Sequence, residues 1–228
     1  MSIGALLVSL LPYIIGSVLV PVYVILVILL LKNPNRGLLK AVAFVAGITA
    51  TRLLQGLIFG FVLTKSAAST DDSSGKGLVV STLLLVLGLY LLIAAYKQWR
   101  GEADPDAPPP KWLTMMDSLT PLKAFVIGVG LPLVGVKLWI FTLGALGTIA
   151  EAQVGQPGST LAYLLFIGLA QALLLIPILI RILMPTRSQS MLDDLSGWLA
   201  KNNRSIVMVV SLVFGLYFLY LGISGLLV

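Results

Sequence analysis

Six long apolar segments restrict what this chain can fold into. Nearly all charged residues lie between them or at their ends, and they cover residues 4–31, 38–63, 77–96, 122–150, 159–183 and 205–227. A helix that spans a bilayer needs about 20 mostly apolar residues, and each segment reaches that length. None shows the alternation of barrel strands, and backbone groups in lipid must be hydrogen-bonded within the chain. With 58% apolar residues, the sequence predicts an all-α polytopic membrane protein with six transmembrane helices.

The basic residues between these segments predict the topology. The odd-numbered connections hold Lys32, Arg36, Lys40, Lys97, Arg100, Lys111, Lys123, Arg181, Arg187, Lys201 and Arg204, whereas the even-numbered connections hold only Lys65 and Lys76. Basic loops favour the cytoplasmic side, so both termini are expected outside. These charges lie beside helix ends and form no folded basic face, so no nucleic-acid partner is expected.

The absence of cysteine and histidine narrows the function. The chain contains neither residue. Disulfides, thiolate metal sites and histidine-dependent catalysis are therefore excluded. We expect no cofactor, no metal and no catalytic residue, and an enzyme is the least expected class.

An internal repeat is indicated by two short matches. Residues 88–92 (Gly-Leu-Tyr-Leu-Leu) resemble 215–219 (Gly-Leu-Tyr-Phe-Leu), and Gly47 pairs with Gly168 after similar apolar runs. Shared apolar composition is the alternative explanation. The order of the matches favours a duplication.

The proline-rich, acidic segment 102–110 marks the boundary of that repeat, because it cannot be helical. We expect a first three-helix repeat over 1–97, a linker with a short interfacial segment over 98–121, and a second repeat over 122–228. An odd number of crossings in each half makes the two repeats inverted. The second includes an amphipathic helix over about 188–201, which reads as an interfacial anchor or as a gate.

Two basic residues lie inside the apolar segments. Arg52 and Lys137 are each about 21 to 23 Å along a helix from the cytoplasmic end. Facing lipid, each would cost about 2.5 to 3.5 kcal/mol, so both are expected to face the bundle interior. An anion site is the functional interpretation, and pairing with backbone carbonyls or snorkelling is the structural one. No carboxylate lies deep in a segment, which favours an anionic substrate.

Polar residues and prolines extend this candidate site. Thr49 and Gln55 share a helical face with Arg52, and Gln171 is a further buried candidate in the fifth segment. Pro12, Pro21 and Pro132 are expected to interrupt helices one and four, where freed carbonyls could line a cavity. Kinks without function are the alternative.

Three motifs resemble a known family. They are residues 31–36 (Leu-Lys-Asn-Pro-Asn-Arg) leading to Gly47, the segment from Trp112 to Pro121, and residues 198–204 (Trp-Leu-Ala-Lys-Asn-Asn-Arg). They are similar to the GAP family, the peptidoglycolipid- and sulfolipid-addressing proteins of the LysE transporter superfamily. The resemblance implies export of a lipid or glycolipid across the cytoplasmic membrane.

The chain also departs from that pattern. Val20-Pro21 stands where such proteins often have Asp-Pro, and Gly135-Val136-Lys137 stands where the superfamily often has Asn-Pro-Lys. Only Pro21 and Lys137 carry over, which puts ion coupling in doubt.

The combined interpretation is an exporter or flippase of an anionic lipid or glycolipid in the bacterial inner membrane, working by alternating access. Export of a small polar solute such as an amino acid, or a non-transporting scaffold for lipid synthesis and export, are the alternatives. The expected partners are the bilayer and an amphiphilic anionic substrate, and a homo-oligomer is left open.

Overall fold

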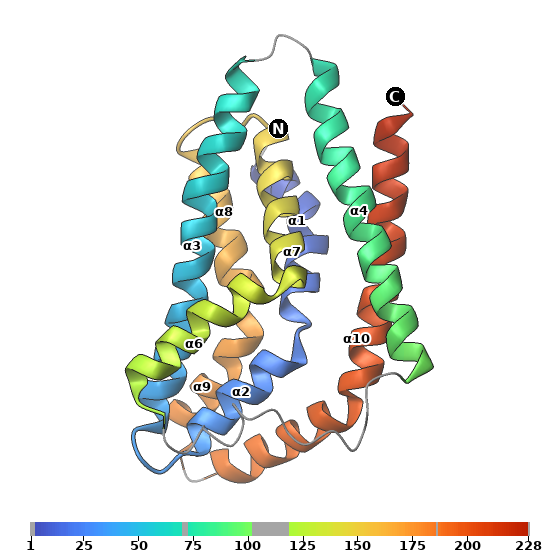
Figure 1. The fold of residues 1–228 in the computed structure, drawn as a ribbon. Helices are drawn as coiled ribbons and strands as arrows, with labels where there is room; N and C mark the ends of the chain where they lie inside the picture. The colour runs from blue at the N-terminus through green and yellow to red at the C-terminus, as the bar shows by residue number, and fades with distance from the viewer. Residues whose placement is uncertain (1–2, 70–72, 102–118, 186, 228) are drawn as a thin grey trace.

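The fold is built from α-helices that follow the predicted apolar segments. The structure, a computed structural model, describes residues 3–69, 73–101, 119–185 and 187–227, without the side chains of 61–80, 83, 136 and 137. Every regular element in these residues is a helix (Figure 1): α1 (Ile3–Val18), α2 (Pro21–Lys32), α3 (Gly37–Ser69), α4 (Ser73–Arg100), α6 (Pro121–Val134), α7 (Val136–Glu151), α8 (Gly158–Ala170), α9 (Ala172–Leu183) and α10 (Ser188–Leu226). The prediction of an all-α chain is confirmed.

Three predicted segments are bent pairs of shorter helices. The bend is 56° between α1 and α2, 72° between α6 and α7, and 58° between α8 and α9. Pro21 begins α2 and has no N–H, so the Ser17 carbonyl loses its usual donor four residues on. The second break falls at Gly135 and the third at Gln171. The expected interruption at Pro12 is wrong, because α1 continues through that residue.

The candidate membrane spans are fewer than the six predicted. Gly37–Gly60 in α3 and Ser188–Leu226 are long and apolar enough to cross a membrane, and counting each bent pair as one span raises the total to as many as five. The predicted span 77–96 lies within α4, where several side chains fall outside the description. Residues 102–118, with most of the predicted linker and its interfacial segment, lie outside the described residues altogether. Six spans therefore stay a prediction.

The cytoplasmic helix predicted over 188–201 is not separate from the sixth apolar segment. Both belong to α10, which runs beneath the bundle and then turns upward beside α4 (Figure 1). Leu192 and Leu199 are buried against the bundle, whereas Met191 and Trp198 are exposed. Lys32 of α2 forms an ion pair with Asp193 of α10. Only part of the predicted apolar face, Leu192 and Leu199, therefore packs on protein.

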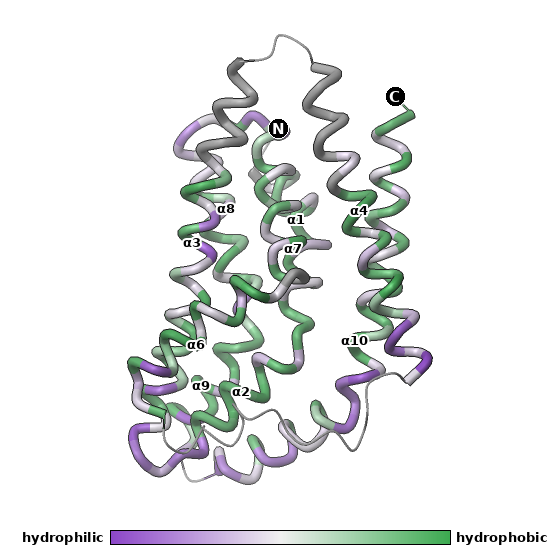
Figure 2. The backbone as a smooth tube through the Cα atoms, in the orientation of Figure 1, coloured by the Kyte–Doolittle hydropathy of each residue, from purple (hydrophilic) through white to green (hydrophobic). Residues whose placement is uncertain are grey.

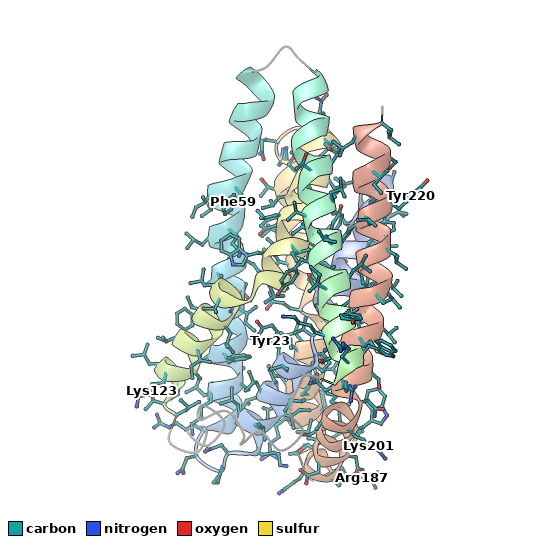
Figure 3. The ribbon with its side chains drawn as sticks, turned by 45° about the vertical axis from the view of Figure 1, so that its right-hand side comes forward. Tyr23, Phe59, Lys123, Arg187, Lys201 and Tyr220 are labelled. Atoms are coloured by element: carbon teal, nitrogen blue, oxygen red, sulfur yellow. The ribbon has the colours of Figure 1, made fainter. Side chains whose placement is uncertain are left out.

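The two ends of the bundle differ in charge. Both termini lie at the upper end in Figure 1, and hydrophilic segments gather at the lower end in Figure 2. Lys123, Arg187 and Lys201 all lie at that lower end (Figure 3). Large apolar side chains such as Val8, Leu57 and Tyr220 are exposed along the helices between the ends. This distribution suits a membrane protein whose basic loops share one side.

The buried core consists of two apolar clusters with polar residues between them. The upper cluster includes Tyr13, Phe141, Phe166 and Phe218 and is formed by α1, α4, α7, α8 and α10. The lower cluster is formed mainly by α2, α3, α6, α9 and the start of α10. Along their helices, the buried polar residues that fall between the two clusters include Ser17, Thr51, Arg52, Gln55, Gln171 and Ser211. This polar layer lies at the level of the helix breaks.

Glycines bring α4 and α10 into close antiparallel contact. A Cβ atom built on Gly88 would lie 2.7 Å from the Leu219 nitrogen, and one built on Gly215 would lie 3.1 Å from the Leu92 nitrogen. A side chain at Gly88 would therefore collide with the backbone of α10, and one at Gly215 would press on Leu92 of α4. The two contacts are reciprocal, because the sequence match aligns Gly88 with Gly215 and Leu92 with Leu219.

Candidate functional site

Arg52 is the charged residue at the centre of the polar layer. It lies in the continuous helix α3 and is only 2% exposed. Its guanidinium carbon lies 5.6 Å from the centroid of the Phe166 ring in α8, a cation–π distance. Among the described residues, its Nε and Nη1 atoms have no hydrogen-bond partner. A buried cation without an opposite charge is costly, so this arrangement needs a reason beyond stability.

Tyr163 of α8 fixes the backbone beside Arg52. Its hydroxyl donates a hydrogen bond of 2.6 Å to the Arg52 carbonyl oxygen. The ring lies against Gly56, where a built Cβ atom would be 2.1 Å from Tyr163 Cε1. Gly56 therefore makes room for Tyr163, and Tyr163 ties α8 to α3 at the level of the arginine.

Thr49 of α3 and Gln171, two predicted site residues that are far apart in the sequence, lie in contact. Thr49 Oγ1 lies 3.0 Å from Gln171 Oε1 and 2.9 Å from the Val45 carbonyl oxygen. Gln171 is 3% exposed and forms the break between α8 and α9. The contact therefore joins α3 to that break, three residues from Arg52.

Gln55 adds an amide with unused hydrogen-bonding capacity. It is 2% exposed, and neither its Nε2 nor its Oε1 has a partner among the described residues. An amide supplies two donors and one acceptor oxygen. Together with Arg52, it offers donors for an oxyanion inside an otherwise apolar bundle.

The remaining predicted site residues are Lys137, Pro21 and Pro132. Lys137 is the second residue of α7, but its side chain lies outside the description, so its place beside Arg52 stays a prediction. Pro21 starts α2 at the first break, and buried Pro132 precedes the second break by three residues. Pro21 thus lies at a helix break, whereas Pro132 lies inside α6; a cavity lined by freed carbonyls at either proline stays a prediction.

Sequence reasoning missed the aromatic residues around the arginine. Tyr23 follows Pro21 by two residues, is 9% exposed, and lies inside the bundle (Figure 3). Its hydroxyl would be 3.4 Å from a Cβ built on Gly135, so it reaches the break between α6 and α7. It also interacts electrostatically with Arg52, as Tyr163 does. In the sequence, only its position next to the helix-breaking Pro21 could have indicated that Tyr23 belongs to the site.

Trp139 braces the break between α6 and α7. Its Nε1 donates a hydrogen bond of 2.9 Å across the break to the Leu133 carbonyl oxygen. Its ring meets Phe59 of α3 edge-on, with centroids 5.5 Å apart. A carbonyl near the end of α6 is thereby satisfied by a side chain, which lets the helix stop in an apolar setting.

The arrangement is suited to binding an anion. The described acidic residues are Glu151 at the end of α7 and Asp193 and Asp194 near the start of α10, all distant in sequence from the polar layer. Within the described part of the chain, no three His, Cys, Asp or Glu residues gather as metal ligands. A cation, an amide and three helix breaks in one buried layer can hold charged oxygens.

The chain matches the model of a known protein family over nearly its whole length. The family model described as "Sap, sulfolipid-1-addressing protein" matches residues 10–224. No curated protein and no solved structure matches the chain.

Proposed function

The chain belongs to the Sap, sulfolipid-1-addressing protein, family, and from this premise we propose that it moves an anionic lipid or glycolipid across the bacterial inner membrane by alternating access. The family description supports a role in lipid export or addressing. The proposed substrate carries a negative headgroup, such as a sulfate or phosphate ester, that is held in the buried polar layer.

Arg52 is the observation that carries this proposal. Its guanidinium is buried, and two of its nitrogens lack partners among the described residues, although unpaired buried donors normally destabilise a fold. An oxyanion headgroup would satisfy these donors with short, charge-assisted hydrogen bonds. Gln55 would add a neutral donor beside it, and Lys137, from the break in helix four, would add a second positive charge.

The helix breaks support an alternating-access mechanism. Secondary transporters place binding sites at discontinuous helices near the middle of the membrane, at the interface of inverted repeats. Here three breaks lie in the polar layer, and the reciprocal glycine contacts between α4 and α10 fit a two-fold relation between the halves. We therefore propose six spans in two inverted repeats, as in the LysE superfamily that the sequence resembles.

The proposed orientation follows the charge distribution. The basic residues at the lower end of the bundle would face the cytoplasm, and both termini would lie outside, in agreement with the positive-inside rule. Transport is favoured over catalysis because the chain has no cysteine or histidine and no acidic residue deep in an apolar segment.

Transport in liposomes tests the role of Arg52. Arg52→Gln should reduce movement of a labelled anionic lipid to background, because the charge that binds the headgroup is lost. Its melting temperature should stay level or rise, since a buried unpaired charge has been removed. Arg52→Lys should keep partial activity, because the charge remains but the planar donor fork does not.

A surface arginine provides the matched control. Arg187→Gln removes one arginine charge from the lower end of the bundle. It should transport like wild type, because Arg187 lies far from the polar layer (Figure 3). A parallel assay with a zwitterionic lipid measures transport that needs no headgroup charge. Wild-type anionic-lipid transport by Arg52→Gln would remove Arg52 from the mechanism, and joint loss of folding and transport would make its role structural.

A further inference from the structure

We propose that a second anion site lies at the lower, basic end of the bundle, in a cleft between the α2–α3 loop and the start of α6. It would bind the sulfate or phosphate group of an anionic headgroup before the group reaches Arg52. The loading role rests on the proposed function, whereas the binding of an oxyanion by the cleft does not.

The cleft is large enough for a headgroup. It has a volume of about 620 Å³ and opens at the surface. One side is formed by Pro34, Arg36 and Lys40, and the other by Leu119, Thr120 and Pro121. Two of the three motifs that resemble the lipid-addressing family thus meet here, although they are far apart in the sequence.

Lys40 is a buried cation on the wall of this cleft. The residue is only 4% exposed, and among the described residues its ammonium group donates one hydrogen bond, of 2.9 Å, to Asn33 Oδ1. Neither Lys40 nor Arg36 forms an ion pair within the described residues; Lys32, at the end of α2, is the one paired with Asp193. An ammonium group has three donors, and among the described residues only one of them is used. The cleft therefore has positive charge to offer an anion.

The loop that carries these cations has a fixed shape. Asn33 Oδ1 also accepts a 3.0 Å hydrogen bond from the Asn35 N–H, which closes a tight turn. Arg36 adopts a left-handed backbone with φ of 57°, and its carbonyl accepts from the Lys40 N–H in the first turn of α3. The polar residues of this motif thus place Arg36 and Lys40 beside the cleft.

The starts of two helices add to the positive potential. α3 begins at Gly37, directly after Arg36, and α6 begins at Pro121, directly after the cleft residue Thr120, although Pro121 has no N–H and Thr120 caps that of Lys123. Helix N-termini favour anions because their first N–H groups point outward. This feature only reinforces a cleft that already contains a buried, uncompensated lysine.

The position of the cleft favours a lipid headgroup as the occupant. Leu119 lines the cleft and also belongs to the lower apolar cluster, so the cleft joins the apolar core to the basic end of the molecule. The end where basic residues gather is where anionic headgroups of a leaflet would lie. A free sulfate or phosphate ion shares the same binding chemistry and is the other source to be tested.

Binding measurements on the full chain in nanodiscs test the site. Sodium sulfate is titrated against sodium chloride at constant ionic strength in zwitterionic nanodiscs, and a labelled anionic phospholipid is titrated in a second series. Arg36→Gln and Lys40→Gln should each weaken binding about tenfold, as expected for the loss of one charge-assisted contact. Lys201→Gln removes a charge from the same end but outside the cleft, and should leave binding unchanged.

Each outcome bears on the proposal. Equal weakening by the cleft variants and Lys201→Gln would overturn it in favour of diffuse surface charge. Sulfate binding that depends on Arg36 and Lys40, with lipid binding that does not, would keep the site but overturn its loading role. Arg36 is exposed, so its variant tests the site even if Lys40→Gln unfolds, which melting temperatures will show.

The two proposals can fail separately. Arg52→Gln should keep wild-type affinity in the cleft while it loses transport. If that variant transports normally and the cleft still binds, the central site is refuted and the cleft stands. If cleft variants bind normally while Arg52→Gln loses transport, the cleft is refuted and the central site stands.

Discussion

Gly56 is the small residue on which the geometry around Arg52 depends. A built Cβ atom at this position would be 2.1 Å from the Tyr163 ring. Gly56→Ala should therefore displace the ring, weaken its hydrogen bond to the Arg52 carbonyl, and destabilise the fold by about 1 to 3 kcal/mol. Thermal unfolding in detergent measures this change.

Gly60 supplies the control one helical turn further along α3. Nothing lies within 4 Å of a Cβ built there, so Gly60→Ala should be neutral or stabilise the helix by up to about 1 kcal/mol. Equal melting temperatures for the two variants would contradict the close contact between Gly56 and Tyr163.

Thr49 gives a second test at the residue scale. Thr49→Val keeps the shape but leaves Gln171 Oε1 without its 3.0 Å contact, so the fold should lose about 1 to 3 kcal/mol. Thr49→Ser keeps the hydroxyl and should lose less. The difference between their melting temperatures isolates the hydrogen bond, and no difference would show that Gln171 does not need Thr49.

The polar members of the site were predictable from sequence, and the aromatic members were not. Arg52, Thr49, Gln55 and Gln171 stand out because polar groups are rare and costly in apolar helices. Aromatic residues carry no such signal. Tyr163 is buried against Arg52 whereas Tyr220 is 70% exposed, and their surroundings in the sequence are similarly apolar.

At the scale of elements, prolines were a partial guide to the helix breaks. Pro21 removes a backbone donor at the first break, whereas α1 continues through Pro12 and Pro132 lies inside α6, three residues before the second break. The break at Gln171 has neither proline nor glycine within two residues. It coincides with the contact from Thr49, which is 122 residues away in the sequence, so only the tertiary structure reveals it.

The α4–α10 pair provides a prediction about symmetry. Gly88→Ala and Gly215→Ala should destabilise the fold by similar amounts, about 1 to 3 kcal/mol each, because both press a methyl group on the facing helix. Gly168→Ala, where nothing lies within 4 Å, is the control for glycine replacement in a helix. Unequal losses, with one variant matching the control, would argue against a two-fold relation.

At the scale of the whole molecule, single cysteines test the topology. The chain has no cysteine, so each introduced thiol is the only one labelled. A cysteine at Ser69, the last residue of α3, should react with an impermeant reagent added outside cells, and one at Ala107 should react only after the membrane is opened. Labelling of both from the same side would refute the inverted halves.

The continuity of α10 has a mechanical consequence. Its 39 residues correspond to about 58 Å of helix at 1.5 Å per residue, nearly twice the roughly 30 Å hydrocarbon thickness of a bilayer. It is therefore longer than one crossing needs, and its turn upward beside α4 occurs within a single helix (Figure 1). Because its backbone hydrogen bonds continue through the turn, the helix resists further bending there. A displacement at the Lys32–Asp193 ion pair would thus be passed along one continuous, curved helix to the glycine contacts with α4.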